Sequence, residues 1–302
     1  MSHKLSEFVA RSATSLPEAL SLLAEPADAD RGPWRPLAGG TDLMVTLAAG
    51  TLPVGRYVDI WPLDELRGIT VTDESVEIGA LTTYTDIRLH PLLAKEFPLL
   101  GLAAKETGAI AIQNRGTLGG NIANASPAAD TPPALLAYDA ELELLSRSGP
   151  RTVPYSRFHS GYKQMDRRPD ELITKVRLKR TPSDAPGHTV HYYRKVGTRA
   201  AQAISKVCFA AFARVEGHRL LNVRLGLGSV APIPLRCTRT ESVLLSAPLD
   251  EPLIRRAEAT LAYEISPIDD VRSTSPYRRR VTLNLLREML SRVPAGQPVV
   301  WL

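Results

Sequence analysis

Hydrophobic and polar residues follow two periods along this chain. Alternating runs, or runs rich in β-branched residues, predict β-strands at residues 57–60, 68–71, 76–79, 141–144, 151–153, 172–178, 189–196, 204–215 and 220–230. Helical spacing of apolar residues predicts helices that begin near Ser15 and Thr83, a run that ends at Ala48, and helices over residues 98–106, 238–246, 251–264 and 276–292. Strands followed by helices are typical of an α+β protein.

Three of the predicted helices carry recognisable start signals, and one of these is a box-like cap formed by Thr83 and Asp86. Ser15 is suited to cap the first helix, because Pro17 favours an early helical position and Glu18 is the acid three residues after the cap. The last helix begins with Ser275 as the expected cap and Pro276 as the first helical residue.

The chain divides at a segment that disfavours regular structure. Residues 181–187 read Thr-Pro-Ser-Asp-Ala-Pro-Gly, a composition typical of a linker. A length of 302 residues also exceeds the usual size of one hydrophobic core. We therefore expect two domains, residues 1–180 and residues 181–302.

Composition and charge exclude several classes of protein. Hydrophobic residues make up 44% and charged residues 23%, as in ordinary soluble proteins, and no apolar stretch approaches the roughly 20 residues that span a bilayer. The first residues lack the apolar region of a signal peptide, so we expect a cytoplasmic chain. The net charge is +5, and the densest basic run, Arg278–Arg280, is interpreted as a solvated or interface face of a helix. No basic tail accompanies it, which disfavours nucleic-acid binding.

Cysteine and histidine usage argues against a metal centre within this chain. The two cysteines, Cys208 and Cys237, are too few for an iron–sulfur cluster, which needs about four thiolates. Cys208 stands in an apolar run and is expected to be a small core residue. The six histidines show no spacing typical of a metal site.

Two glycine-rich segments are candidates for ligand binding. The first, Ala38-Gly39-Gly40-Thr41-Asp42-Leu43, lies between a short extended segment and a helix. Adjacent glycines let the backbone approach a ligand closely, and successive free N–H groups near a helix N-terminus suit an anion such as a pyrophosphate. A plain turn before a helix is the simpler alternative for such a segment.

The second segment, residues 115–130, concentrates three glycines, two asparagines, a serine and an aspartate among small alanines. Such a segment suits a tight loop around a large flat ligand, because its amides and hydroxyls meet polar edges and its small residues leave room for rings. Neither loop matches the dinucleotide fingerprint or a P-loop. From the residues alone, the two loops predict a site for a phosphorylated ligand.

In this order, the two loops resemble the FAD-binding subunit of molybdopterin-containing dehydrogenases, which include carbon monoxide dehydrogenase medium subunits, bacterial xanthine dehydrogenase FAD subunits and aldehyde oxidoreductases. The resemblance is carried by residues 38–43, 117–121 and 126–130. It continues through residues 170–173, 176–178, 193–199, 203–207 and 269–279, so that it covers nearly the whole chain. It implies an FAD domain of the vanillyl-alcohol oxidase (PCMH) type in two subdomains, about residues 1–60 and 61–180. A C-terminal α+β domain with a three-stranded sheet and helices would follow.

The resemblance also implies a function. Substrate would be oxidised at a molybdopterin–molybdenum centre in a large partner chain, and electrons would pass through two 2Fe–2S clusters in a small partner to FAD in this chain. NAD or another acceptor would then receive them, and the complex would be a dimer of heterotrimers. Some relatives carry an extra cluster in a cysteine-rich insertion, and this chain lacks those cysteines. The molybdenum subunit would then determine the substrate.

The family's FAD contacts map onto named positions of this sequence. The implied contacts are Ala38, Gly39, Gly40, Thr41, Asp42, Leu43, Thr117, Gly119, Gly120, Asn121, Asp130, Ile173 and Lys195. Amides of the first loop would hold the pyrophosphate, those around Gly119 and Gly120 would line the FAD, and Ile173 would pack on the ring system. Lys195 would lie near the polar edge of the flavin and stabilise negative charge there. The alternatives are an exposed strand lysine for Lys195 and a helix cap for Asp130.

Two other functions remain possible for this sequence. A self-sufficient flavin oxidase or dehydrogenase would use the same N-terminal fold. The C-terminal segments of this chain resemble electron-transfer subunits, which argues against that alternative. A scaffold that has lost FAD is the second alternative, and the intact glycines of both loops argue against it.

Overall fold

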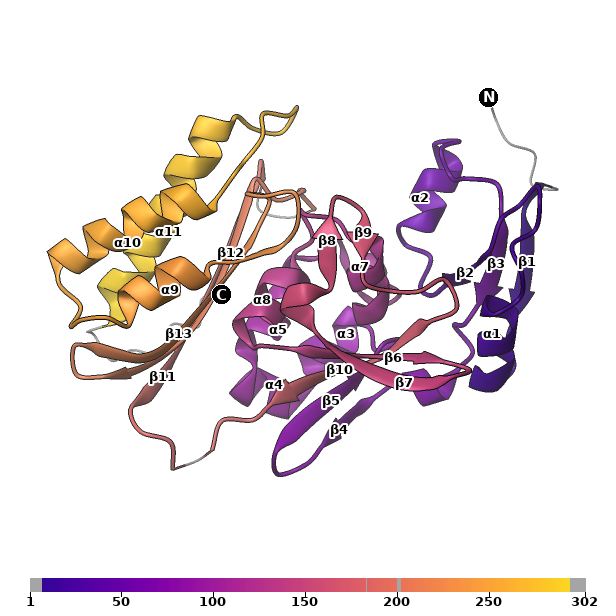
Figure 1. The fold of residues 1–302 in the computed structure, drawn as a ribbon, viewed down its shortest axis with the longest axis horizontal. Coiled ribbons are helices and arrows are strands. Elements are labelled where there is room, and N and C mark those ends of the chain that lie inside the picture. The colour runs from indigo at the N-terminus through magenta and orange to yellow at the C-terminus, as the bar shows by residue number, and fades with distance from the viewer. Residues whose placement is uncertain (1–6, 183, 200–201, 294–302) are drawn as a thin grey trace.

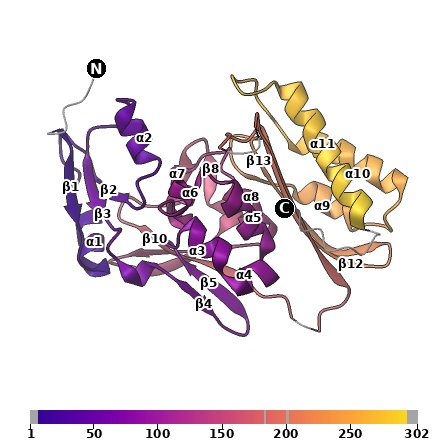
Figure 2. The same ribbon diagram turned by 180° about the vertical axis from the view of Figure 1, so that it is seen from behind.

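The structure is a computed structural model that describes residues 7–182, 184–199 and 202–293. Residues 1–6 and 294–302 of the two expected domains, and Ser183 of the expected linker, lie outside the described residues. Three sheets follow one another along the longest axis of the molecule, and the C-terminal helices cover the last of them (Figures 1 and 2). The expectation of an α+β fold is confirmed.

The first sheet is small and parallel. Its strand order is β1-β3-β2, and both pairings are parallel. Ser15 caps α1 as predicted, because its side chain accepts a hydrogen bond from the Glu18 N–H. Parallel strands end at the same edge of a sheet, so the segments that follow β2 and β3 emerge there together. The elements are β1 (Val9–Ser12), α1 (Leu16–Leu23), β2 (Trp34–Leu37), α2 (Leu43–Ala48) and β3 (Arg56–Asp59).

The middle sheet is antiparallel, in the order β4-β5-β10-β6-β7. Six short helices lie between β5 and β6 in the chain. All except the one at residues 110–113 contribute buried residues to the core on this sheet, which includes Ile78, Leu99 and Leu135. The predicted capping box of Thr83 and Asp86 is present at the start of α3. The strands are β4 (Ile69–Val71), β5 (Ser75–Gly79), β6 (Glu141–Ser146), β7 (Gly149–Pro154) and β10 (Leu172–Lys179). The helices are α3 (Tyr84–Leu89), α4 (Pro91–Glu96), α5 (Pro98–Glu106), α6 (Ile110–Gln113), α7 (Leu118–Asn124) and α8 (Thr131–Ala137), and a small hairpin is formed by β8 (His159–Gly161) and β9 (Gln164–Met165).

The third sheet has four strands in chain order, so the expectation of three was wrong. The additional strand, β14, has two residues that pair with Gly226 and Leu227, and it is too short to give an alternating pattern. One face packs against the last three helices. The other face joins the core of the middle sheet and its helices (residues 69–179, called the middle part) through residues such as Tyr193 and Phe212. The elements are β11 (His188–Val196), β12 (Val207–Glu216), β13 (Arg219–Gly228), β14 (Leu235–Arg236), α9 (Thr238–Leu244), α10 (Glu251–Glu264) and α11 (Ser275–Arg292).

Two expectations about the last helix are corrected. Thr274, and not Ser275, caps α11, since the Thr274 side chain accepts from the Tyr277 N–H. Arg278 is not part of a solvated face: its side chain is only 3% exposed and pairs with Asp270 at 2.7 Å. Its buried place follows from the position of α11 against the third sheet. Cys208 is a buried core residue, as expected. No helix in the described part of the chain is long and apolar enough to cross a membrane.

The third sheet approaches α8 so closely that one strand position must be glycine. A Cβ added at Gly226 would lie 2.1 Å from the carbonyl oxygen of Pro133. We expect Gly226→Ala to lower the free energy of unfolding by about 2 kcal/mol, because the backbones must separate. Chemical denaturation measures this. Gly101→Ala in α5, where a Cβ meets no atom beyond its own helix, should instead stabilise the protein by about 0.5–1 kcal/mol. Equal stability of Gly226→Ala and wild type would contradict the close packing.

His191 lies in the same contact region, against Tyr138 and Phe212. Burial lowers the pKa of His191 from 6.5 to about 4, and burial does the same to the pKa of His159. Below pH 6.5 these two histidines therefore bind protons in the unfolded chain but stay neutral in the folded chain until the pH approaches 4. We expect stability to fall by about 1.4 kcal/mol per pH unit per histidine between about pH 6.5 and about pH 4. The Tm measured across this range should decline less steeply for His191→Gln than for wild type. Parallel plots of Tm against pH would contradict a lowered pKa of His191 in the folded chain.

Candidate functional site

The first glycine loop leaves the end of β2 and enters α2. Gly40 has φ +73°, a left-handed conformation that favours glycine. The N–H groups between Gly39 and Asp42 find no acceptor within the described residues. Asp42 stands at the N-cap of α2, and its side chain makes no capping hydrogen bond. Four consecutive backbone donors are thus left for a ligand or for solvent.

The second glycine loop uses its glycines differently. The Gly119 N–H donates to the Ala80 carbonyl at 2.8 Å, and the Gly120 N–H donates to the Thr117 hydroxyl at 3.1 Å. A Cβ at Gly119 would lie 2.7 Å from the Ala80 Cβ. These two amides are therefore engaged within the protein, and the glycines serve close packing at the start of α7. In contrast, Oδ1 of Asn121 is buried and has no partner among the described residues.

The structure brings the two loops together. A Cβ at Gly39 would lie 1.7 Å from the Arg115 carbonyl oxygen, so the first loop touches the start of the second with no space for a side chain. A Cβ at Gly120 would come within 3.9 Å of the Ala38 Cβ. The free donors of the first loop and the small residues of the second thus lie at one place.

A stack of charged and aromatic side chains accompanies this contact. The guanidinium carbons of Arg115 and Arg67 lie 3.7 Å and 4.1 Å from the centroid of the Trp61 ring. Trp61 follows β3, and Arg115 opens the second loop, so the stack joins the first sheet to the middle part. No local sequence pattern links these three residues, so the stack was not predicted.

The far end of the second loop is fixed by the third sheet, its helices and their connections (the described residues of 188–293, called the C-terminal part). The Asp130 carboxylate pairs with the Lys195 ammonium at 2.7 Å, with side chains 11% and 6% exposed. The Lys195 ammonium also donates to the Glu106 carbonyl at 2.8 Å, at the last residue of α5. Burial raises the pKa of the Asp130 carboxyl, and the Lys195 charge and the Ser205 hydroxyl act against that rise. Lys195 is therefore not an exposed strand lysine.

Asp130 occupies the N-cap position of α8, yet its side chain makes no capping bond. The helix-cap alternative for its carboxylate is therefore wrong. The C-terminal part also holds the Asp130 backbone, because the Tyr193 hydroxyl donates to its carbonyl at 3.1 Å.

Ile173 lies on β10 in the core of the middle part, 4% exposed. Its neighbour Thr174 accepts a hydrogen bond from the Ala80 N–H, beside Gly119. Ile173 is thus near the second loop, within a packed core.

Other contacts of the second loop were not expected from the sequence. Lys163, in the β8–β9 hairpin, donates to Oδ1 of Asn124 at 2.7 Å. Tyr193 reaches Asp130 from β11, and Ser205 reaches it from the connection that precedes β12. Each pair joins residues far apart in the chain, so sequence spacing carries no signal of them.

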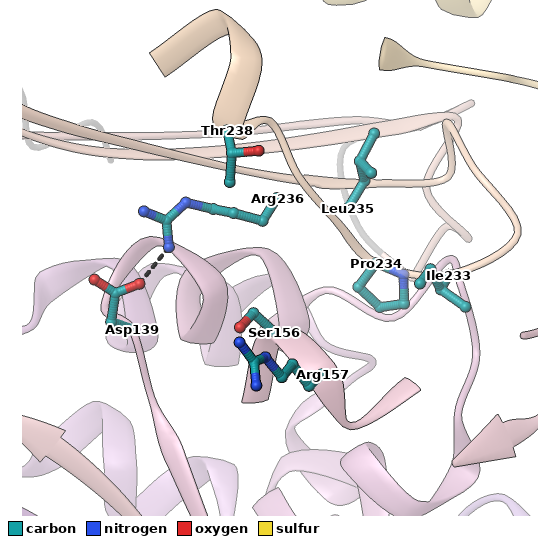
Figure 3. A pocket seen from close by; sticks show the side chains of 8 residues that line it. All are labelled: Asp139, Ser156, Arg157, Ile233, Pro234, Leu235, Arg236 and Thr238. Atoms are coloured by element: carbon teal, nitrogen blue, oxygen red, sulfur yellow. Dashed lines mark hydrogen bonds and ion pairs between the residues drawn. The ribbon is translucent and has the colours of Figure 1, made fainter. Parts of the chain in front are cut away.

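A cavity of about 470 Å³ lies elsewhere, where the middle part meets the third sheet (Figure 3). Arg236 crosses it to pair with Asp139. None of the predicted site residues lines this cavity, so the loops and not the cavity define the candidate site. The described residues contain no group of three metal-binding side chains.

The fold and the two loops define a class of protein. The chain belongs to the FAD-binding subunits of the molybdopterin dehydrogenases and is an oxidoreductase subunit: residues 6–180 match the FAD binding domain in molybdopterin dehydrogenase, and residues 191–293 match the CO dehydrogenase flavoprotein C-terminal domain.

Individual relatives are similar over almost their whole length. The chain is 31% identical to a putative xanthine dehydrogenase FAD-binding subunit of Escherichia coli, over 94% of this chain and 95% of the relative. It is 33% identical to the glyceraldehyde dehydrogenase medium chain of Sulfolobus acidocaldarius, over 91% and 94% of the two chains. In structure it resembles carbon monoxide dehydrogenase from Hydrogenophaga pseudoflava, with a TM-score of 0.88, 27% identity, and coverage of 96% and 98%.

The ion pair at the site should contribute strongly to stability. Lys195→Met leaves the Asp130 carboxylate buried without its counter-ion, so we expect unfolding to become easier by about 3 kcal/mol. The double variant Asp130→Asn/Lys195→Met should lose less than the sum of the single variants. Lys175→Met is the matched control, because Lys175 pairs with Glu77 while 41% exposed and should cost less than about 1 kcal/mol. Similar losses in both single lysine variants would count against a buried pair.

Proposed function

We propose that the two glycine loops hold FAD and that this chain is the flavoprotein subunit of a molybdenum hydroxylase. The observation that carries the proposal is the convergence of the loops: unfilled backbone donors at Gly39–Asp42 lie beside a loop that holds a buried, unpartnered Asn121 Oδ1. A phosphorylated flavin fits this donor set, since consecutive amides bind a diphosphate and an amide side chain meets a polar edge.

Each predicted residue takes a role in this proposal. Gly39, Gly40 and Thr41 bind the pyrophosphate through backbone amides, with Ala38, Asp42 and Leu43 shaping the loop. Gly119 and Gly120 act through close packing, which lets the cofactor approach α7, and Thr117 and Asn121 offer polar contacts. Ile173 supports the ring system from the core. Asp130 and Lys195 face the polar edge of the flavin as an ion pair.

The proposed complex contains two partner subunits besides this chain. When bound, FAD supplies electron transfer from 2Fe–2S clusters in a small partner subunit to NAD or another acceptor. A large partner subunit holds the molybdopterin–molybdenum centre, and the assembly is a dimer of heterotrimers in the cytoplasm. The two matched family regions and the names of the relatives, which include medium chains of carbon monoxide dehydrogenase, support this reading.

We also propose the domain limits that the sequence predicts. Residues 1–180 form an FAD domain of the vanillyl-alcohol oxidase (PCMH) type, with subdomains at about residues 1–60 and 61–180, and residues 181–302 form the C-terminal domain. The separation of the first sheet from the middle sheet near residue 60 supports the inner boundary.

A visible spectrum of the chain after incubation with FAD and desalting tests the cofactor. Wild type should retain close to one flavin per chain, and Gly40→Val should retain almost none, because a β-branched residue at φ +73° distorts the loop. Gly32→Val is the matched control: Gly32 has φ +67° and open space around it, away from the loops. It should carry similar backbone strain and keep its flavin.

The same measurement on the complex decides between outcomes. If wild type binds no FAD alone but does so when purified with its partner chains, the site is completed by assembly. Absence of flavin in both preparations would refute the proposal, and full flavin occupancy in Gly40→Val would remove the first loop from the site.

A further inference from the structure

The Asp130 carboxylate has a second partner besides Lys195. The Ser205 hydroxyl donates to Asp130 Oδ1 at 2.5 Å, while the Lys195 ammonium holds Oδ2. Ser205 is completely buried. The two oxygens of the carboxylate are thus assigned to different donors, and both donors come from the C-terminal part.

Ser205 is itself held by a buried polar network. The Ser229 hydroxyl donates to the Ser205 carbonyl at 3.0 Å, and the Ser229 N–H donates to the Pro127 carbonyl of the second loop at 2.8 Å. Arg278 of α11 donates to the carbonyls of Lys206 at 2.7 Å and of Ser229 at 3.0 Å. The Ser205 and Lys206 carbonyls are thus both held by buried donors, so the segment that carries the Ser205 hydroxyl has a fixed place.

We propose that Ser205 is a positioning residue of the flavin site, which fixes the Asp130 carboxylate and, through it, the Lys195 ammonium. This inference rests on the proposed FAD site. A hydroxyl that donates to a carboxylate shares its negative charge in a strong charge-assisted bond. Without the donor, the carboxylate carries more of its charge and is free to rotate away from the orientation that serves Lys195.

The consequence is electrostatic. A larger negative charge beside the polar edge of the flavin opposes the addition of electrons. Ser205→Ala removes one oxygen atom and adds no bulk. We expect it to keep FAD and to make two-electron reduction at least tenfold less favourable, which corresponds to a fall of about 30 mV in midpoint potential. Ser205→Thr keeps the hydroxyl and should restore the wild-type potential.

The experiment is a spectroscopic redox titration of the full chain loaded with FAD, or of the complex where FAD binding requires it. Wild-type flavin content is measured first, because its absence refutes the proposed function, and this inference with it. Thr240→Ala is the matched control: its buried hydroxyl also bonds a carboxylate, that of Glu264, on the far side of the C-terminal part. It should leave the potential unchanged.

Each outcome decides the proposal. A lowered potential in Ser205→Ala, restored in Ser205→Thr and absent in Thr240→Ala, supports it. A wild-type potential in Ser205→Ala overturns it, and so does an equal shift in Ser205→Ala and Ser205→Thr, which would show a packing effect. If Ser205→Ala loses FAD, retention by Ser205→Thr supports the role of the hydroxyl, and loss in both variants overturns it.

Discussion

The buried ion pair between Asp130 and Lys195 is the constraint on which the arrangement of the site depends. The end of the second loop, the last residue of α5 and the strand β11 all meet at these two side chains. Removing two charges from water is costly unless each is fully satisfied. Here the carboxylate has Lys195 and Ser205, and the ammonium has Asp130 and the Glu106 carbonyl. Such a junction tolerates only a narrow range of positions, so it fixes the third sheet against the second loop.

The other end of the site is set by close approach of backbones. The contact of Gly39 with the Arg115 carbonyl and the contact of Gly119 with Ala80 leave no room for side chains. Parallel pairing in the first sheet delivers the Gly39 loop and Trp61 to the same edge. Arg115 then spans both features, through its carbonyl against Gly39 and its guanidinium against Trp61. Glycines thus have two uses at the site: Gly40 supplies a left-handed turn, and Gly39 and Gly119 allow backbones to approach closely.

Local features were predictable from the sequence, and features that depend on distant contacts were not. The Ser15 cap and the Thr83 capping box follow from a few neighbouring residues, and both glycine loops were located as candidates. The burial of Arg278 depends on how α11 lies on the third sheet, and β14 depends on pairing with β13. The amide of Gly119 looks free in the sequence, but the fold gives it Ala80 as an acceptor. Sequence spacing identifies which backbone could donate, and only the fold shows which donors remain available.

The pairing of Lys195 changes how its charge would act on the proposed flavin. A lone buried lysine would present a full positive charge, whereas the charge of this lysine is largely balanced by Asp130 at 2.7 Å. The field at a nearby ring then depends on the orientation of the pair more than on its net charge, since the field of a dipole changes sign with direction. Orientation is set by the Ser205 and Glu106 contacts, which belong to the C-terminal part and to α5. The C-terminal part therefore contributes more than a surface on which the middle part packs. It also orients the Asp130–Lys195 ion pair.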